Sequence, residues 1–350
     1  MVIIIKINTV ERKIWNSRRL AKLLKYRTNR RIKIKKMKKN GIYFSTVSNN
    51  FSIFPQRRSW NEREKFIVPR NFSLEDNRNE TLKFFGDVFD YIEKKQSKRE
   101  IFFDSTFVDN VTESTLMYFF AIISDVKCAN YDIGGNHSRN FWVKKIYKNC
   151  GFDKLLKNNE FSFNILNEGN ILLIRGNKVK TDVAKKVCDF LTDKIDINTR
   201  EFYGAFIELM TNTVQHAYLN EDKLEKKWQV FVEYKNSSVK FIFLDTGKGI
   251  PATVKRTKYE KLKMLIPRIM NESDILKSAF DGEFRTRTEK DYRGKGLPQI
   301  YDVMCSSCVK NAVVYSGKSY MGIIKTGNDL YHCFDDDFYG TLYEFTIQGV

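Results

Sequence analysis

The chain has 350 residues and a formal net charge of +19, with 28 Phe, 17 Tyr and only 5 Pro. This length is enough for two ordinary domains, and the aromatic content excludes a long disordered chain. The charge is uneven: residues 1–40 hold 15 Lys and Arg against one acid, a net +14, so the rest carries only +5. We therefore interpret residues 1–58 as a basic arm that contacts an acidic protein, a nucleic acid or an anionic membrane surface.

The apolar segments are too short to cross a membrane. The longest, residues 116–123, falls well below the roughly 20 residues that a spanning helix needs, and no secretory signal is visible. The six cysteines lie far apart in the sequence except for the pair Cys305 and Cys308, so we expect free thiols in a reducing, cytoplasmic setting. A zinc site with His332 and Cys333 is the less favoured alternative, because Cys305 and Cys308 fall in a stretch expected to be helical.

Strands and helices alternate between residues 65 and 160. The hydrophobic pattern predicts strands at residues 66–68, 100–104 and 130–133. It predicts helices at residues 82–92, 114–126 and 139–150. Such alternation indicates an α/β domain with at least partly parallel strand pairing.

The order of these parts resembles the STAS domain, the fold of anti-sigma-factor antagonists. The resemblance rests on a strand ending at Asp104, the sequence Phe-Val-Asp that ends at Asp109, and a helix that closes on residues 150–156. It implies a protein partner for this domain. In that family a serine directly after the aspartate can be phosphorylated, but Asn110 follows here. We therefore expect Thr112 and Ser114 to cap the next helix rather than to accept phosphate.

Residues 201–218 have the spacing of a helix that carries a polar face. Glu208, Asn212 and His216 follow one another at intervals of four residues, so an α-helix aligns them one turn apart. A carboxylate there can deprotonate a water or hydroxyl, and the Asn212 oxygen can hold Mg²⁺. An exposed polar face explains the trio equally well.

Two glycine motifs follow. Asp245 ends the second of two predicted strands, at residues 229–234 and 238–244, and glycines at 247 and 249 make a tight turn with open backbone. The carboxylate can accept a hydrogen bond from an amine such as adenine N6, although a polar hairpin is an equal alternative. A second glycine motif, at residues 293–297, opens a helix predicted at 298–310, whose unpaired amide groups favour phosphate. The alternative there is a simple loop-to-helix joint.

In this order and spacing, the three motifs together resemble the GHKL ATPase superfamily, which includes gyrase, heat-shock chaperones, histidine kinases and anti-sigma kinases. Gly340 and Thr341, before a strand predicted at 342–347, match its closing element. The resemblance implies the Bergerat fold over residues 170–350, an α/β sandwich with a mixed sheet and helices on one face. The fold class expected for the whole chain is therefore α/β, with a STAS-like domain at 65–160 followed by this ATP-binding domain.

The resemblance also implies roles for single residues, with ATP and Mg²⁺ as cofactors. Glu208 matches the general base, Asn212 the Mg²⁺ ligand and Asp245 the adenine-binding carboxylate. The remaining matched positions, beside the adenine ring or at the phosphates, are Gly247, Gly249, Gly294, Lys295, Gly296, Leu297 and Thr341. Residues 251–292 match the ATP lid, from which Arg285 or Arg287 would reach the γ-phosphate unless both lie in a solvated loop.

The histidines separate the kinase classes. None of His137, His216 and His332 lies on a long helix ahead of the ATPase-like zone, so we do not expect histidine autophosphorylation. Residues 208–218 look most like anti-sigma serine kinases, which act on STAS proteins. We therefore expect an ATP-binding, Mg²⁺-dependent, ATP-hydrolysing regulatory switch that forms a homodimer or larger assembly. The alternatives are a serine/threonine kinase that acts on a STAS domain and a nucleotide-dependent binding module with negligible turnover.

Overall fold

The computed structural model describes residues 63–93, 100–128, 131–151, 165–217, 227–257, 271–284, 296–324 and 329–349, together with two short strands nearer the N-terminus. Contacts divide the chain into two compact units, residues 1–63 and 64–350. In the first unit, strands β1 (Tyr43–Phe44) and β2 (Ile53–Phe54) pair antiparallel. Most of the basic arm lies outside the described residues.

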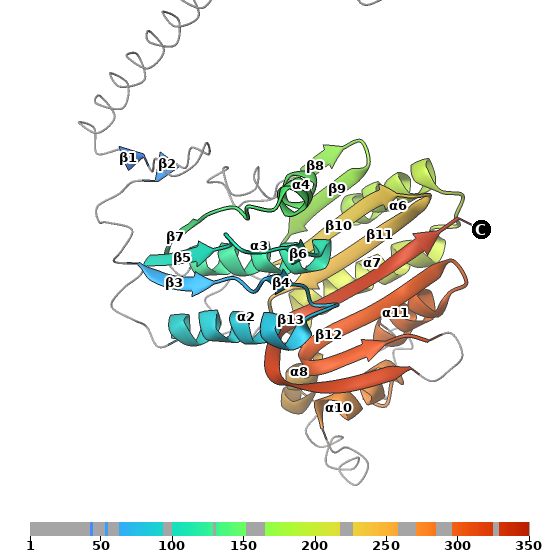
Figure 1. The fold of residues 1–350 in the computed structure, drawn as a ribbon. Helices are drawn as coiled ribbons and strands as arrows, with labels where there is room; N and C mark the ends of the chain where they lie inside the picture. The colour runs from blue at the N-terminus through green and yellow to red at the C-terminus, as the bar shows by residue number, and fades with distance from the viewer. Residues whose placement is uncertain are drawn as a thin grey trace, which may run out of the picture. The chain divides into compact units, whose positions relative to one another are not determined.

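Residues 64–151 form an α/β layer (Figure 1). Its main sheet is parallel, with the order β3-β5-β7, and a second parallel pair joins β4 to β6. The elements are β3 (Glu64–Ile67), β4 (Asn71–Phe72), α2 (Arg78–Glu93), β5 (Glu100–Asp104), β6 (Asn110–Val111), α3 (Glu113–Cys128), β7 (Asp132–Gly135) and α4 (Phe141–Asn149). The predicted α/β arrangement with parallel pairing is confirmed for this part of the chain.

Residues 165–349 contain a six-stranded sheet with the order β12-β13-β11-β10-β9-β8. Its strands are β8 (Ile165–Glu168), β9 (Ile171–Gly176), β10 (Trp228–Lys235), β11 (Ser238–Asp245), β12 (Val309–Gly322) and β13 (Leu330–Gln348). Each of the five pairings among them is antiparallel. The expected mixed sheet is therefore wrong. Three of these pairings, β8–β9, β10–β11 and β12–β13, join strands that no helix separates in the chain, and such hairpin connections produce antiparallel pairs.

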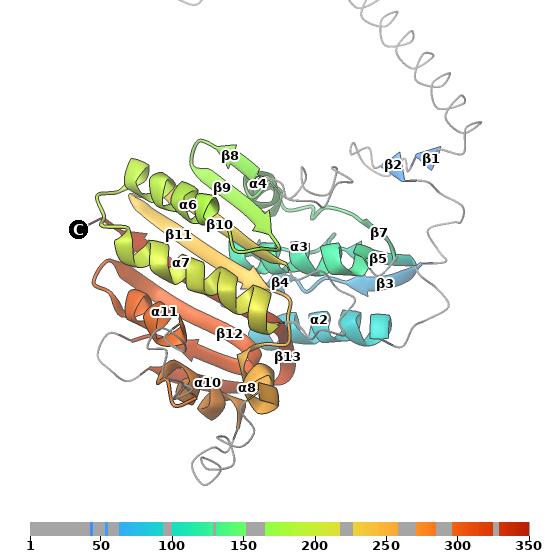
Figure 2. The same ribbon diagram turned by 180° about the vertical axis from the view of Figure 1, so that it is seen from behind.

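Five described helices cover one face of this sheet (Figure 2). They are α6 (Thr181–Lys194), α7 (Arg200–Asn212), α8 (Ile250–Thr257), α10 (Glu272–Phe280) and α11 (Gly296–Cys305). The helix predicted at 298–310 ends earlier than expected, at Cys305, because β12 already begins at Val309. Successive apolar residues of β12 point to opposite faces of the sheet. Within the described residues, no helix has the length and apolar run that a membrane span requires.

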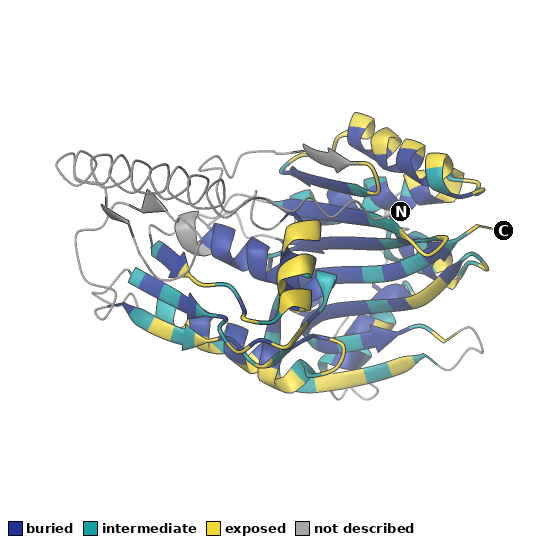
Figure 3. Ribbon diagram, turned by 45° about the horizontal axis from the view of Figure 1, so that its top comes forward, coloured by how far each residue is buried: buried dark blue, intermediate teal, exposed yellow. Residues whose placement is uncertain are grey.

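The sheet is buried on both faces. Alternation along β11 turns Phe241 and Phe243 toward the helices of Figure 2, and Ile242 and Leu244 toward the α/β layer. Figure 3 shows the central strands mostly buried. Residues 64–349 therefore build three layers around one sheet, with a hydrophobic core on each side of it.

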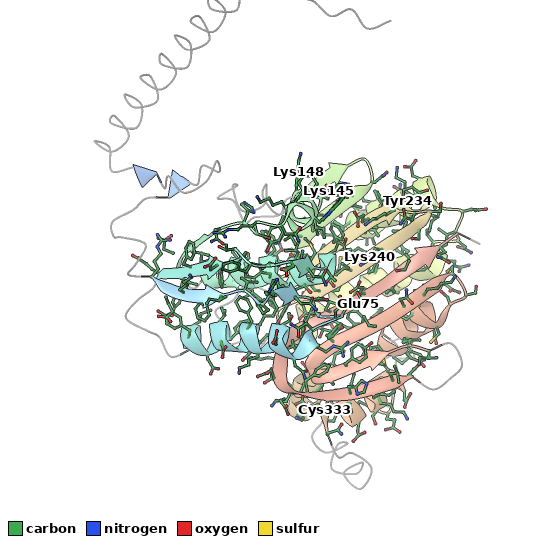
Figure 4. The ribbon with its side chains drawn as sticks, in the orientation of Figure 1. Glu75, Lys145, Lys148, Tyr234, Lys240 and Cys333 are labelled. Atoms are coloured by element: carbon green, nitrogen blue, oxygen red, sulfur yellow. The ribbon has the colours of Figure 1, made fainter. Side chains whose placement is uncertain are left out.

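Polar contacts add to the apolar packing between α3 and the sheet. Lys240 on β11 is labelled in Figure 4. Its Nζ lies 3.1 Å from Glu113 Oε2 and 3.2 Å from Glu344 Oε1. Burial alone would lower the pKa of Lys240, but the two carboxylates outweigh it and raise that pKa. Gln229 Nε2 on β10 donates to the carbonyl oxygen of Met117, at 2.5 Å. The α/β layer is thus attached to the strands that carry the predicted site.

Candidate functional site

Three segments that are far apart in the sequence meet at the end of α7. Gly296 begins α11 so close to α7 that a Cβ atom on it would lie 2.5 Å from Glu208 Oε2 and 3.7 Å from Asn212 Nδ2. A Cβ atom on Gly247, just after β11, would clash with the backbone of Ala217. The fold therefore brings the helix motif, the loop after Asp245 and the start of α11 to one place.

The end of α7 leaves α-helical geometry at this site. Residues Thr213–Ala217 form a π-helical turn, η2, a feature found frequently at functional sites. The carbonyl oxygen of Ala217 accepts a hydrogen bond of 2.7 Å from the backbone N–H of Lys248, which ties the turn to the glycine loop. A π turn holds more residues than an α turn, so the four-residue spacing from Glu208 to Asn212 does not continue to His216. His216 is exposed, whereas the other two are half-buried.

Asp245 is the most deeply buried acid of the predicted site, with an exposed fraction of 5%. Its Oδ1 accepts from the backbone N–H of Gly247 at 2.8 Å, and its Oδ2 accepts from Thr213 Oγ1 at 3.4 Å. The backbone of Thr341, its register partner on β13, donates a further bond. Burial nevertheless raises the pKa of Asp245 to about 7. The carboxyl group is held in position but is only about half ionised at neutral pH.

Position 340 on β13, next to Asp245, requires glycine. Gly340 has a φ of 105°, and a Cβ atom there would clash with the carbonyl oxygen of Asp245. Thr341, the next residue, is buried, and its Oγ1 lies 2.9 Å from Ser316 Oγ. Ser316 Oγ also accepts from the backbone N–H of Ile250 at 2.7 Å. Thr341 therefore lies opposite Asp245 in the sheet, in a network that includes the start of α8.

Glu208 and Asn212 present polar groups that the described chain does not fully pair. Burial raises the pKa of the Glu208 carboxyl group. Among the described residues, Asn212 Nδ2 has no hydrogen-bond partner although the atom is buried. A buried amide without a hydrogen-bond partner costs free energy, so a partner from outside the described residues would stabilise this atom. Rotation of the amide exchanges its nitrogen and oxygen, which lets Asn212 present an acceptor to a cation.

Part of the predicted site lies outside the described residues. Gly294, Lys295, Arg285 and Arg287 fall there, whereas Gly296 and Leu297 form the first turn of α11. Of the proposed lid, α8 and α10 are described and are joined by an ion pair.

That pair connects Lys255 Nζ to Glu272 Oε1 at 2.6 Å. Glu272 Oε2 also accepts from the backbone N–H of Lys318 on β12 at 2.9 Å. The described part of the lid is therefore fastened to the edge of the sheet.

The loop after Asp245 is backed by α3 of the α/β layer, a contact that the sequence did not predict. Thr246 forms a hydrogen bond with the side chain of Asp125, whose pKa is raised by burial. A small cavity of about 10 Å³ lies beside them, lined also by Arg175 and Gln229. Within the described chain, Gln229 Oε1 is buried and unpaired. This polar junction connects the predicted adenine position to the neighbouring layer.

A second contact from α3 reaches β13 just before Gly340. Tyr118 OH accepts from the backbone N–H of Tyr339 at 2.8 Å and donates to its carbonyl oxygen at 3.2 Å. The Tyr118 ring stacks on Phe338, with ring centroids 4.0 Å apart. The end of β11 and the middle of β13, which lie on either side of the Asp245 carboxyl group, are thus both contacted by α3.

The hydroxyl groups at the start of α3 are engaged with one another. Thr112 Oγ1 lies 2.8 Å from Thr115 Oγ1 and 3.2 Å from Ser114 Oγ. Ser114 is only 2% exposed, and Thr115 Oγ1 accepts from the backbone N–H of Leu74 at 2.9 Å. These contacts favour the structural interpretation of both residues over phosphate acceptance.

The cysteines lie in separate elements. Cys305 ends α11, Cys308 lies in the turn before β12, and Cys333 lies in β13. Across the part of the chain that the structure describes, His, Cys, Asp and Glu do not form a metal-binding group of three or more.

Comparison of the chain with protein-family models and with curated proteins finds no match. The functional interpretation therefore depends on the motif pattern and on the contacts described above.

Proposed function

We propose that residues 165–349 bind ATP with Mg²⁺ in the manner of the GHKL ATPases, and that the chain is a nucleotide-operated, ATP-hydrolysing regulatory switch. The observation that carries this proposal is the convergence of Asp245, the Glu208–Asn212 pair and the start of α11. These residue types in this order match the three motifs of that superfamily. The three segments are far apart in the sequence, and it is the fold that brings them together.

Asp245 suits an adenine amine. An ionised carboxylate only accepts hydrogen bonds, so it selects an amine donor over a carbonyl group. Its bonds from Gly247 and Thr213 fix the orientation of both oxygens before a ligand arrives. The pKa of Asp245 is about 7, so a hydrogen bond donated to its carboxylate by a bound amine would lower this pKa and shift the group to full ionisation.

The opposite side of the site suits phosphates and a hard cation. The first N–H groups of α11 have no partners within the helix and favour an anion, and Gly296 leaves them open on the side of Glu208. The unpaired amide of Asn212 offers a ligand for Mg²⁺. When bound, Mg·ATP supplies the phosphoanhydride bond that is hydrolysed. Glu208 would take the proton of the attacking water on a carboxylate oxygen, and its raised pKa suits a base that works near neutral pH.

Hydrolysis is favoured over transfer to the chain's own α/β layer. The hydroxyl groups of Thr112 and Ser114 are occupied by neighbours, and Ser114 is buried. A kinase reaction would therefore use a separate STAS protein as acceptor. Incubation with γ-labelled ATP distinguishes the three functions. Free labelled phosphate supports hydrolysis, labelled protein supports a kinase, and neither product supports a binding module.

The switch would be read out through α3. Thr246, just after β11, is bonded to Asp125, and Tyr339, within β13, is bonded to Tyr118. A ligand that moves either segment therefore also changes the docking of α3. A ligand shifts such an equilibrium only through its different affinity for the two states. The adenine position, which lies between these contacts, provides that difference.

Isothermal titration with a non-hydrolysable ATP analogue and Mg²⁺ tests the proposal. Wild type should bind, and Asp245→Asn should not, because its amide places a donor opposite the adenine amine. Asp189→Asn is the matched control, since Asp189 is exposed on α6. Equal affinity of wild type and Asp245→Asn would refute the proposed site.

A further inference from the structure

Three large aromatic side chains are exposed on two neighbouring segments of the α/β layer. Phe107 is 62% exposed, Phe141 69% and Trp142 66%. Phe107 lies in the loop after β5, whereas Phe141 and Trp142 begin α4, whose outer side is exposed in Figure 3. The two segments are bonded together, since the backbone N–H of Arg139 donates to the carbonyl oxygen of Thr106 at 3.0 Å. The three rings therefore belong to one surface, which we call the α4 surface.

Basic side chains accompany these rings. The Arg139 guanidinium carbon lies 5.4 Å from the centroid of the Phe107 ring, and Lys145 Nζ lies 5.5 Å from the centroid of a Trp142 ring. Lys144 and Lys148 are also exposed on α4, and Figure 4 labels Lys145 and Lys148 there. The nearby acid Asp109 is paired with Arg70 at 2.6 Å. The α4 surface is therefore aromatic and positively charged.

The fold of α4 does not depend on the exposed rings. Val143 and Tyr147 anchor the helix and are 1% and 3% exposed. Asn140 caps its N-terminus by accepting from the backbone N–H groups of Trp142 and Val143. Clustered apolar surface that contributes nothing to the core is typical of an interaction site.

We propose that the α4 surface binds single-stranded nucleic acid, with bases stacked on the three rings and phosphates beside the four basic side chains. Single-strand binding combines a positive track with aromatic platforms. The Phe141 and Trp142 rings are inclined by 74°, so their faces are open in different directions.

A membrane surface fits these contacts less well. The cations of Arg139 and Lys145 lie over the rings of Phe107 and Trp142, so neither ring can enter hydrocarbon without drawing a charge with it. A base, in contrast, can stack on the open side of a ring while the cation beside that ring meets a phosphate.

The test is fluorescence anisotropy of the full chain with a labelled oligothymidylate of about 20 nucleotides. Phe141→Ala/Trp142→Ala should weaken binding at least about tenfold, because each stacked base is lost with its ring. Tyr203→Ala, an exposed aromatic residue of α7, should change nothing. An abasic oligonucleotide of equal length should bind the double variant as it binds wild type, because only the phosphates remain.

Charge is tested separately. Lys144→Glu/Lys145→Glu should weaken binding and reduce its salt dependence, whereas Lys185→Glu/Lys186→Glu on the exposed side of α6 should have a smaller effect. Trp142→Phe keeps a ring and should retain most of the affinity. Unchanged binding of the abasic oligonucleotide by Phe141→Ala/Trp142→Ala excludes misfolding as the cause of its loss.

Two results would overturn the proposal. One is equal affinity of wild type and Phe141→Ala/Trp142→Ala for the oligothymidylate. The other is binding of wild type to phosphatidylserine vesicles, but not to the oligonucleotide, with loss of vesicle binding in the same double variant. That outcome would assign the α4 surface to a membrane.

Discussion

Replacing Asp245 with Asn should stabilise the protein at the same time as it abolishes nucleotide binding. The carboxyl group is buried at the end of β11, and burial raises its pKa from 3.8 to about 7. Because the folded state holds the proton more tightly than the unfolded state, this group stabilises the fold at low pH. That contribution is lost as the pH rises from about 4 to about 7.

The magnitude follows from the pKa change. At pH 8 both states are ionised, and the buried charge lowers the free energy of unfolding by about 4 kcal/mol relative to a neutral side chain. At pH 5 the folded carboxyl group is protonated, and the difference falls to about 2 kcal/mol. Asn is a neutral side chain of the same shape, and its oxygen can still accept from the backbone N–H of Gly247.

Urea unfolding of wild type and Asp245→Asn at pH 5 and pH 8 measures this difference. The variant should gain more stability at pH 8 than at pH 5, while other titrating groups cancel between the two proteins. A variant that is less stable at pH 8, or that gains equally at both pH values, would refute the assignment of a strongly raised pKa to Asp245.

Four further outcomes are expected. Nucleotide affinity should fall about tenfold from pH 8 to pH 6, measured by isothermal titration, because the adenine amine requires the ionised form of Asp245; a flat profile would contradict this. Glu208→Gln should keep nucleotide affinity but slow phosphate release at least about 100-fold in a steady-state assay; unchanged turnover would favour a binding module. Asp125→Ala should weaken nucleotide affinity and remove any nucleotide-dependent protection of α3 from hydrogen exchange, whereas protection that persists would exclude this contact as the readout. Lys240→Met should lower the free energy of unfolding by about 1–3 kcal/mol in urea, because two half-buried carboxylates lose their shared cation; an unchanged free energy of unfolding would show that water replaces this cation without cost.

Periodicity determined much of the local structure. The strand predicted at 100–104 has those bounds, and the two strands around residues 236 and 237 form the hairpin β10–β11. Asn236 and Ser237 have φ values of 51° and 57°, the conformation that a tight two-residue hairpin turn needs. The end of α11 was misjudged because a short apolar run fits a helix and a strand equally well, and only pairing with β13 selects the strand. The division of residues 64–350 into two domains between 160 and 170 stays a prediction.

In the candidate site too, some residues could be identified from the sequence and others only from the structure. Residue type and spacing pointed to Glu208, Asn212 and Asp245, because their chemistry is carried by short local motifs. The contact of Asp245 with Thr213 could have been suspected only from the position of Thr213 next to Asn212. Nothing in the sequence indicated the contact of Thr246 with Asp125.

The sequence by itself thus determined which chemical groups the protein carries and the local helix or strand on which each is placed. Only the tertiary structure decided that the sheet is antiparallel and that α3 supports the loop after Asp245. The physical reason is that helices and turns follow from interactions between near neighbours in the chain. Strand direction and buried polar pairs depend on segments that meet only when the whole chain has folded.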